Sequence, residues 1–219
     1  MPRALLVAVL ALSASCTDPG GGAPPSITTV GQAPTATPGT AAITTAPGAS
    51  AAPTSPVAAT TCRAPATPMV PMTEGPYYRA NPPQRTVLYT PGVAGTRLLL
   101  SGQVLSRSCA PIANARVDFW QADGTGAYDN AGYGFRGYQL TDAQGRYELD
   151  TVVPGLYPGR TEHIHVKVTP PGGATITSQL YFPTSTQNER DSIFSRAMLV
   201  TLTPGTPLRG RFDFIVDLP

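Results

Sequence analysis

Seven short runs rich in β-branched, aromatic and leucine residues dominate the chain after residue 95. They span residues 97–105, 115–122, 135–140, 146–152, 163–170, 174–182 and 211–218, and Gly, Pro, Asn or Asp separate them. Short strands with frequent turn residues predict an antiparallel β-sandwich. Within this pattern, TDAQGR at 141–146 indicates a hairpin connection in which Gly145 adopts positive φ. Only residues 187–199 hint weakly at a helix, so the predicted fold class is all-β with little helix.

The first sixteen residues have the pattern of an export signal. One charge, at Arg3, precedes an apolar run over residues 4–14, and Ser15 and Cys16 follow. About 11 apolar residues are too few to span a bilayer, so residues 1–16 are predicted to be a signal peptide rather than a membrane helix. The residues before Cys16 resemble a bacterial lipoprotein cleavage box, although Ser13 departs from it. We therefore expect a protein anchored to the outer face of a membrane only by lipid at Cys16, or otherwise a secreted one.

Composition divides the rest of the chain in two. Residues 17–61 are almost entirely Ala, Thr, Pro, Gly and Ser, with Asp18 as the single charge. Such a tract cannot bury enough apolar surface to offset its conformational entropy, so it is predicted to be a disordered tether. From Cys62 onward, aromatic and aliphatic residues reach the frequency usual in globular domains. Residues 62–219 are long enough for one domain with its own core.

Charge and cysteine content narrow the possible partners and compartment. The net charge is +2, with one lysine, Lys167, and scattered arginines, so nucleic acid is excluded as an expected partner. With Cys16 assigned to lipid, Cys62 and Cys109 remain as a pair in an oxidising compartment. We predict a disulfide that joins the start of the domain to an early hairpin. The alternative is two free buried thiols.

Both histidines of the chain lie two residues apart, at His163 and His165. Side chains at i and i+2 of a strand share a face, so the two imidazoles project together while Ile164 points to the other layer. They form either half of a metal site or a hydrogen-bonded or exposed pair. With no third histidine, no spare cysteine and no H-x-x-x-H spacing, zinc-finger, zincin and three-histidine sites are excluded.

The remaining candidate ligands are carboxylates and tyrosines, namely Asp123, Asp129 and Glu162, with Tyr128, Tyr133, Tyr138, Tyr147 and Tyr157. A tyrosine ionises near pH 10, so as a ligand at neutral pH it needs a strongly acidic metal such as Fe(III) beside it. Two phenolates, two imidazoles and a hydroxide would suit ferric iron.

The order of several motifs resembles the intradiol ring-cleavage dioxygenases, the family of catechol 1,2-dioxygenase and protocatechuate 3,4-dioxygenase. These motifs are TEGPYY at 73–78, GQVLSRSCAPIANARVDFWQADGTGAYD, FRGYQLTDAQGRYELDTVVPGLYPGRTEHIHVKV and TSQLYF. Together they cover residues 62–219. The resemblance implies a β-sandwich of the intradiol dioxygenase or prealbumin-like type with a non-haem Fe(III) cofactor.

Carried onto this sequence, the resemblance implies a role for each matching residue. Tyr128, Tyr157, His163 and His165 match the iron ligands, and Tyr157 matches the phenolate that is released when substrate binds and then accepts a proton. Arg160 matches the arginine that lies over the substrate ring. Gln179 matches a pocket glutamine, and Pro76 and Tyr77 are expected to line the pocket.

The implied activity is the cleavage of catechols by O₂ between the two hydroxylated carbons, which gives cis,cis-muconates outside the cytoplasm. Two other classes remain open. One is a non-catalytic, transthyretin-like β-sandwich that binds sugar or another protein. The other is a different H-x-H metalloenzyme, such as a copper or manganese oxidase. Neither the preferred catechol nor the oligomeric state, monomer or dimer, follows from the sequence.

Overall fold

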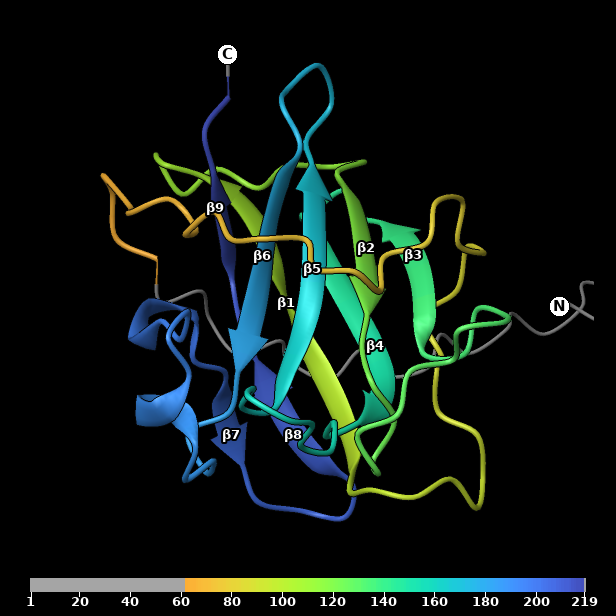
Figure 1. The fold of residues 1–219 in the computed structure, drawn as a ribbon. Helices are drawn as coiled ribbons and strands as arrows, with labels where there is room; N and C mark the ends of the chain where they lie inside the picture. Colours follow the sequence, from red (N-terminus) through yellow and green to blue (C-terminus); the bar gives the residue numbers. More distant parts are fainter. Residues whose placement is uncertain (1–61, 219) are drawn as a thin grey trace, which may run out of the picture. The chain divides into compact units, whose positions relative to one another are not determined.

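The computed structural model describes residues 62–218, which contain nine strands and two 3₁₀ helices (Figure 1). The strands are β1 (Arg97–Ser106), β2 (Arg116–Trp120), β3 (Arg136–Leu140), β4 (Arg146–Val152), β5 (His163–Thr169), β6 (Ile176–Tyr181), β7 (Thr201–Thr203), β8 (Leu208–Arg211) and β9 (Phe214–Val216). The short helices η1 (Asn188–Arg190) and η2 (Arg196–Met198) lie between β6 and β7.

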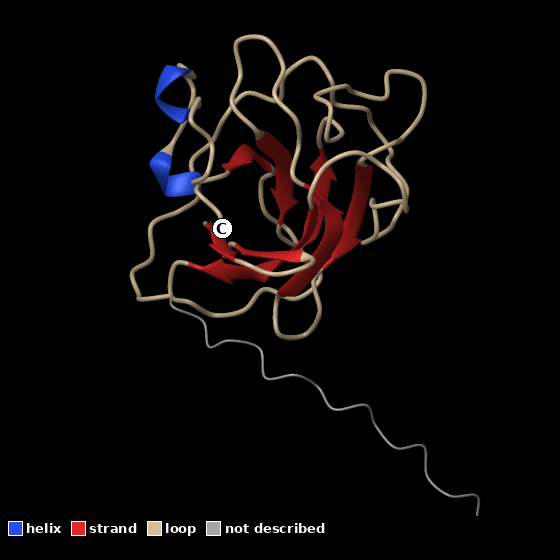
Figure 2. Ribbon diagram, turned by 90° about the horizontal axis from the view of Figure 1, so that it is seen from below, coloured by secondary structure: helices blue, strands red, loops and turns tan. Residues whose placement is uncertain are grey.

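The strands form two stacked sheets, which Figure 2 shows from one end. The first sheet has the order β4-β1-β8-β7, and β9 also pairs with β1. The second sheet has the order β3-β2-β5-β6 and is antiparallel throughout. In the first sheet, β1 pairs in parallel with both β8 and β9. The predicted all-β sandwich is therefore confirmed, although one of its sheets is mixed.

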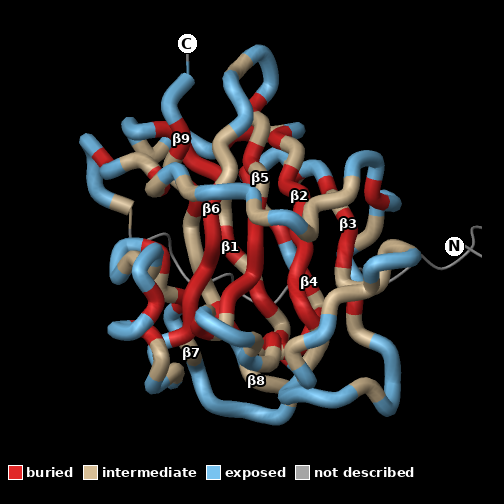
Figure 3. Tube along the Cα trace, in the orientation of Figure 1, coloured by how far each residue is buried: buried red, intermediate tan, exposed pale blue. Residues whose placement is uncertain are grey.

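Alternation along the strands of the second sheet separates a core face from an outer face. On β5, Ile164, Val166 and Val168 are fully buried between the sheets. On β2, Val117 and Phe119 are also buried between the sheets. Figure 3 shows the buried segments of the strands in red. Because side chains alternate along a strand, the residues between them point to the other side of the sheet. The prediction that Ile164 and the two histidines face opposite ways is thus confirmed.

The predicted helix over residues 187–199 is wrong. Only the two single-turn helices η1 and η2 form, because the backbone is extended at Asp191 (φ −85°, ψ 113°) and at Ser195 (φ −132°, ψ 122°). The predicted strand over 211–218 is present only as the shorter β9, Phe214–Val216, and β8, Leu208–Arg211, which overlaps the predicted range only at Arg211, was not predicted. Strand β7 was not predicted, since three residues carry too little periodicity to be distinguished from a loop.

The turn at 141–146 does not connect a hairpin. Gly145 has the expected positive φ of 71°, and its N–H donates to the carbonyl of Asp142 at 2.9 Å. However, β3 and β4 on its two sides belong to different sheets. The turn therefore carries the chain from one layer to the other. The connection that holds Cys109 likewise runs between sheets, from β1 to β2.

A segment without regular structure, residues 66–89, contacts three strands that lie at the edges of the sheets, and we refer to this segment as the strap. The N–H of Met72 donates to the carbonyl of Thr177 on β6, that of Arg85 to Tyr138 on β3, and that of Leu88 to Asp150 on β4, at 2.8–2.9 Å. Figure 1 shows the strap crossing the outer face of the second sheet. Edge strands left bare would pair with other chains, so the strap completes the sandwich.

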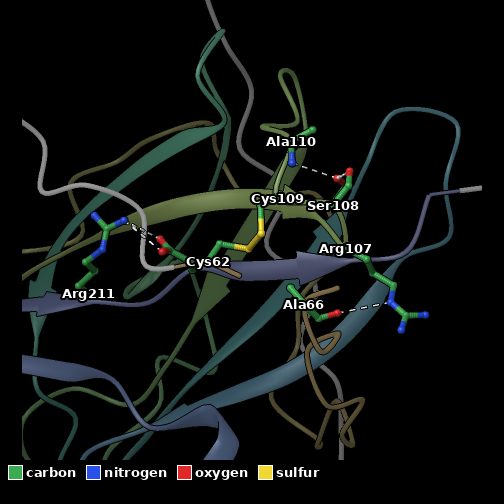
Figure 4. The surroundings of a disulfide bond; sticks show 9 residues. Cys62, Ala66, Arg107, Ser108, Cys109, Ala110 and Arg211 are labelled. Atoms are coloured by element: carbon green, nitrogen blue, oxygen red, sulfur yellow. Dashed lines mark hydrogen bonds and ion pairs between the residues drawn. A yellow bond between two sulfur atoms is a disulfide. The ribbon is translucent and has the colours of Figure 1, made fainter. Parts of the chain in front are cut away.

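The predicted disulfide is present and joins Cys62 to Cys109 across 47 positions of the sequence (Figure 4). Nearby, the N–H of Ala66 donates to the carbonyl of Arg107 at 2.8 Å. The bridge therefore attaches the beginning of the strap to the β1–β2 connection. The predicted signal peptide, Cys16 and the tether lie outside the described residues. Among residues 62–218 no helix is long and apolar enough to span a membrane.

Removal of the disulfide is expected to destabilise the domain. A cross-link that closes a loop of this length lowers the entropy of the unfolded chain and stabilises the fold by about 4 kcal/mol. We expect the double variant Cys62→Ser/Cys109→Ser, which leaves neither cysteine of the pair as a free thiol, to lose most of that amount in urea unfolding. Ser108→Ala, next to the bridge, serves as the control and should stay close to wild type. An unchanged free energy of unfolding in the double variant would contradict the prediction.

Candidate metal centre

Strand β5 brings both histidines to the outer face of the second sheet, beneath the strap. In the sheet register His165 lies between Trp120 on β2 and Gln179 on β6, and His163 lies beside Tyr181. Both imidazoles are almost fully buried, with residue exposures of 2% for His163 and 1% for His165. The buried polar face of the sheet thus has these two side chains at its centre.

The two predicted tyrosine ligands lie next to the histidines. The Nε2 atoms of His163 and His165 are 3.1 Å apart, and the Oη of Tyr157 is 3.1 Å from His163 Nε2. The ring of Tyr128 meets that of Tyr157 edge on, with centroids 5.8 Å apart. The structure therefore brings together all four residues that the sequence analysis named as ligands.

Hydrogen bonding and burial leave the histidines in the form that binds metals. The Nδ1–H of His163 donates to the carbonyl of Thr161 at 2.7 Å, so the lone pair is on Nε2 and faces the cluster. Burial, helped by the charge of Arg160, lowers the pKa of His163 to about 4. Burial and the neighbouring His163 also lower the pKa of His165 well below its usual value. Both rings are therefore neutral at pH 7.

The Tyr128 hydroxyl is buried and makes no well-formed hydrogen bond within residues 62–218. Burial, and next the neighbouring Tyr157, raise the pKa of Tyr128 well above its usual value. Asp123 shapes the turn before this tyrosine by accepting the N–H groups of Thr125 and Ala127 at 2.8 and 3.0 Å. Gly126 has φ of 88°, and a Cβ there would lie 2.1 Å from the carbonyl oxygen of Leu156. Glycine thus permits the close approach that sets Tyr128 beside Tyr157.

The donor set fits ferric iron better than a carboxylate-bound metal. Among the described residues there is no group of three or more His, Cys, Asp or Glu side chains placed to hold a metal. The candidate Asp129 instead accepts three backbone N–H groups, from Ala131, Gly132 and Gly134, which lower its pKa to about 2. Two imidazole nitrogens and two phenol oxygens remain, and one of the phenols, Tyr128, makes no well-formed hydrogen bond within the described residues. Such phenols become good ligands only beside a strongly acidic cation, which Fe(III) is.

The ring of His165 is held by packing rather than by a second hydrogen bond. Its Nδ1 has no partner in the described part of the chain. On one side Trp120 stacks on the imidazole, with centroids 4.8 Å apart and planes at 8°. Gly75 of the strap also packs on the ring, because a Cβ there would lie 3.3 Å from His165 Cε1. The flat indole and the side-chain-free glycine together fix the orientation of this ring.

Arg160 lies beside Tyr157 and makes three side-chain contacts. Its Nε donates to Asp191 Oδ2 at 2.9 Å, its Nη2 donates to Gln179 Oε1, and its Nη1 is 3.4 Å from Tyr157 Oη. Burial raises the pKa of Tyr157, and the positive charge of Arg160 opposes that rise. Gln179 in turn donates to the carbonyl of Thr73 in the strap at 3.1 Å. The predicted arginine and glutamine are therefore neighbours in one network.

The strap supplies the predicted pocket residues Pro76 and Tyr77. The Tyr77 ring stacks on that of Tyr128, with centroids 4.1 Å apart and planes at 12°, while Pro76 is exposed. The buried side chain of Arg136, which the sequence analysis did not identify, joins the two regions. Its Nη2 donates to the carbonyl of Tyr77 at 2.9 Å and its Nη1 to that of Asp129 at 2.7 Å. Nothing in RGYQL distinguishes Arg136 from an exposed strand arginine.

A cavity of about 370 Å³ adjoins Tyr157 and Arg160. Its walls are the loop before β5 and residues around η1, namely Leu156, Tyr157, Pro158, Gly159, Arg160, Thr161, Gln187, Arg190 and Asp191. Ligand pockets in proteins have volumes of about 300–1,000 Å³, so a small aromatic molecule would fit in this space. The cavity lies beside the donor cluster rather than in the core.

The stability of the metal-free protein is expected to fall between pH 6.5 and pH 4. His163 titrates near 6.5 when unfolded and near 4 when folded, so within this window the unfolded chain binds more protons. The contribution is complete above pH 6.5 and disappears as the pH falls to 4, at a cost of about 3 kcal/mol. Urea unfolding across this range should reveal the slope, and His163→Gln should flatten it. Equal slopes in both proteins would refute the assignment.

Comparisons with known proteins find relatives over most of the described domain. The family model described as Dioxygenase matches residues 73–203. The chain is 27% identical over 197 residues to the protocatechuate 3,4-dioxygenase beta chain of Burkholderia cepacia, covering 70% of this chain and 84% of that protein. It is also 27% identical over 124 residues to a hydroxyquinol 1,2-dioxygenase of Rhizobium sp. (strain MTP-10005), but covers only 42% of that relative and 46% of itself.

Solved structures show the same likeness. The dioxygenase domain of a dioxygenase carbohydrate-binding protein fusion from Streptomyces sp. SirexAA-E is 46% identical, with a TM-score of 0.68, and the match covers 70% of this chain and all of that one. The 3-chlorocatechol 1,2-dioxygenase of Rhodococcus opacus 1CP is 26% identical, with a TM-score of 0.61, over 65% of this chain and 69% of that one.

Proposed function

Because this chain belongs to the intradiol dioxygenase family and is an oxygenase of that class, we propose that it holds Fe(III) and opens the rings of catechols with O₂ outside the cytoplasm. Both oxygen atoms enter the product, a cis,cis-muconate, so no further reductant is consumed. The observation that carries the proposal is the convergence of His163, His165, Tyr157 and Tyr128 in one cluster, in which both imidazoles are buried.

Ferric iron bound by these four residues would supply Lewis acidity, which draws electron density from a catechol and makes its ring carbons reactive toward O₂. The side chains around the donor cluster would exclude water and fix the orientation of the donors. Burial excludes water from the two imidazoles, and the stacked Trp120 and the close packing of Gly75 keep His165 from rotating. Such preorganisation strengthens every electrostatic interaction in the site.

Tyr157 and Arg160 are suited to handle the charges of the reaction. A catechol must lose its hydroxyl protons to bind as a dianion, and the phenolate oxygen of Tyr157 is an available acceptor for one of them. Arg160 keeps one edge of its guanidinium toward that oxygen, at 3.4 Å. A fixed, always charged arginine can stabilise negative charge that develops on the ring, and a flexible lysine would do so less well.

The cavity beside Tyr157 is the proposed site for the substrate ring. It shares Tyr157 and Arg160 with the donor cluster, and its apolar walls at Leu156 and Pro158 suit an aromatic ligand. Tyr77 and Pro76 of the strap are proposed to complete the pocket, since the Tyr77 ring also meets that of Tyr157 edge on, with centroids 6.2 Å apart. Tyr77 already stacks on Tyr128.

We also propose that the protein is exported and anchored by lipid at Cys16. The disulfide between Cys62 and Cys109 supports export, because such bonds persist in oxidising compartments and are rare in the cytosol. Metabolic labelling with a radioactive fatty acid tests the anchor, and Cys16→Ala is the matched control. Absence of label from the unaltered chain would exclude lipidation.

The activity is tested on the full chain produced in an oxidising compartment. Elemental analysis should find iron in stoichiometric amount, and the protein should show the visible absorption of tyrosinate bound to Fe(III). Catechol, hydroxyquinol and protocatechuate are then added under air, with O₂ uptake and the ring-opened carboxylic acid as readouts. A colourless protein that contains no iron and consumes no O₂ with any of the three would refute the proposal. Copper or manganese in place of iron would favour a different metalloenzyme.

A further inference from the structure

Asp191 has a buried carboxylate that reaches the site from the loop between β6 and β7. Its side chain is 2% exposed, and Oδ2 accepts both the Nε–H of Arg160 at 2.9 Å and the N–H of Thr161 at 3.0 Å. The other oxygen, Oδ1, accepts the N–H of Ile193 at 3.1 Å. Both oxygens therefore have hydrogen-bond partners, and the carboxylate joins its own loop to the segment before β5.

The backbone that carries Arg160 gives its side chain little support. Pro158 and Gly159 before it are exposed, and Gly159 has φ of 79° with open space where a Cβ would be. A long arginine side chain on such a turn can adopt many rotamers, and holding one of them costs conformational entropy. Fixed contacts must therefore come from outside the turn.

Two contacts from other elements define the plane of the guanidinium. The carboxylate of Asp191 accepts the Nε–H of Arg160. The side-chain oxygen of Gln179, on β6, accepts a hydrogen bond from Nη2. These two contacts leave Nη1 directed to Tyr157. We infer that Asp191 is the positioning residue that sets the orientation of Arg160 over the proposed substrate site. This inference rests on the proposed function for the role of Arg160, but the contact itself does not depend on that role.

The same carboxylate supports the segment between Tyr157 and the first histidine. Asp191 accepts the N–H of Thr161 and so holds the backbone at this residue. The carbonyl of Thr161 in turn accepts the Nδ1–H of His163. A single acidic side chain thus orients the arginine directly and the first histidine through one residue. Partners of this kind usually change the activity of a site by about 10- to 100-fold when they are removed.

The first test is a double-mutant cycle. Asp191→Asn keeps the size of the side chain but loses the charge and one acceptor, and we expect kcat for catechol to fall about 10- to 100-fold with iron content unchanged. In an Arg160→Ala background the same change should lower kcat by clearly less, because most of its effect acts through Arg160 and only the support that reaches His163 through Thr161 remains. An equal loss in both backgrounds, or wild-type kcat in Asp191→Asn, would overturn the inference.

A second readout does not depend on turnover. In the metal-free full chain, the ¹⁵N-labelled Nε–H of Arg160, identified by its absence in Arg160→Ala, should exchange slowly with solvent. Its exchange should become at least about 10-fold faster in Asp191→Asn. Slow exchange that persists in Asp191→Asn would overturn the inference even if the protein opened no catechol. Fast exchange in the wild-type protein would refute positioning by Asp191, and the absence of ring cleavage would refute the proposed function. The two proposals can therefore fail independently.

Asp213→Asn is the matched control. Asp213 also pairs with an arginine, Arg211, at 3.0 Å and accepts a backbone N–H, that of Gln103, at 3.0 Å. It lies between β8 and β9, away from the donor cluster. If Asp213→Asn lowered kcat or altered Arg160 Nε–H exchange as much as Asp191→Asn, a general loss of stability would explain both, and positioning by Asp191 would be wrong.

Discussion

His163→Ala is expected to abolish both iron retention and ring cleavage. The imidazole offers a neutral Nε2 lone pair to the cluster, and its Nδ1–H is already committed to Thr161. Alanine would leave three donors and a hole into which water could enter. We expect iron content to fall far below stoichiometric and cleavage to fall on the order of 10³-fold or more, as when a member of a cooperative catalytic group is removed. Elemental analysis and O₂ uptake measure the two effects.

The control for His163→Ala is the loss of another buried polar side chain. Gln139 is 6% exposed and donates its Nε2–H to the carbonyl of Glu148 at 2.6 Å, but it lies on β3, outside the donor cluster. Gln139→Ala should lose stability while it retains iron. If His163→Ala bound iron as fully as Gln139→Ala, the assignment of His163 as a ligand would be wrong.

Tyr157→Phe is expected to reduce turnover by about 10²- to 10⁴-fold, the range typical of a lost acid–base group. Phenylalanine keeps the ring and its packing against Tyr128 but removes the oxygen that lies 3.1 Å from His163 Nε2. The visible absorption of the iron form should weaken but persist, because Tyr128 would still contribute a phenolate. Stopped-flow kinetics and absorption spectra of the same preparation separate the two effects.

Tyr133→Phe makes the same chemical change outside the cluster. The Tyr133 hydroxyl donates to the carbonyl of Ala80 at 2.9 Å, and its removal should leave both turnover and spectrum near those of wild type. Equal turnover in Tyr157→Phe and Tyr133→Phe would show that Tyr157 has no special part in the reaction.

The elements that were predicted well are those whose signal is local. A period of two along HIHVKV places Ile164 in the core and both histidines on the outer face, which follows from strand geometry alone. Six of the predicted strands are present with ends that differ by one or two residues. The two candidate ligand tyrosines came from the resemblance, not from periodicity, because Tyr128 and Tyr157 lie in loops where no repeating pattern marks them.

What was missed depends on contacts between distant parts of the chain. Asp191 lies 31 positions after Arg160, within a polar stretch that was interpreted as a weak helix. The backbone of Asp191 is extended, and its carboxylate accepts hydrogen bonds from Arg160 and Thr161 in the loop before β5. Arg136 is almost fully buried although its sequence neighbours suggest a surface position. A buried arginine becomes recognisable only when the carbonyls around it are known, since only three-dimensional structure brings Tyr77 and Asp129 to it.

The parallel pairing of β1 with β8 and β9 has a consequence for how this domain folds. Leu98 pairs with Leu208, and Val104 with Phe214, so the central strand of the first sheet needs partners about 110 positions later in the chain. Contacts of such high sequence separation slow folding, because a long loop must close before they form. During synthesis the sandwich therefore stays incomplete until residues 208–216 are available. For a protein proposed to be exported, this requirement would leave the sandwich incomplete while the C-terminal strands are still being made or moved across the membrane.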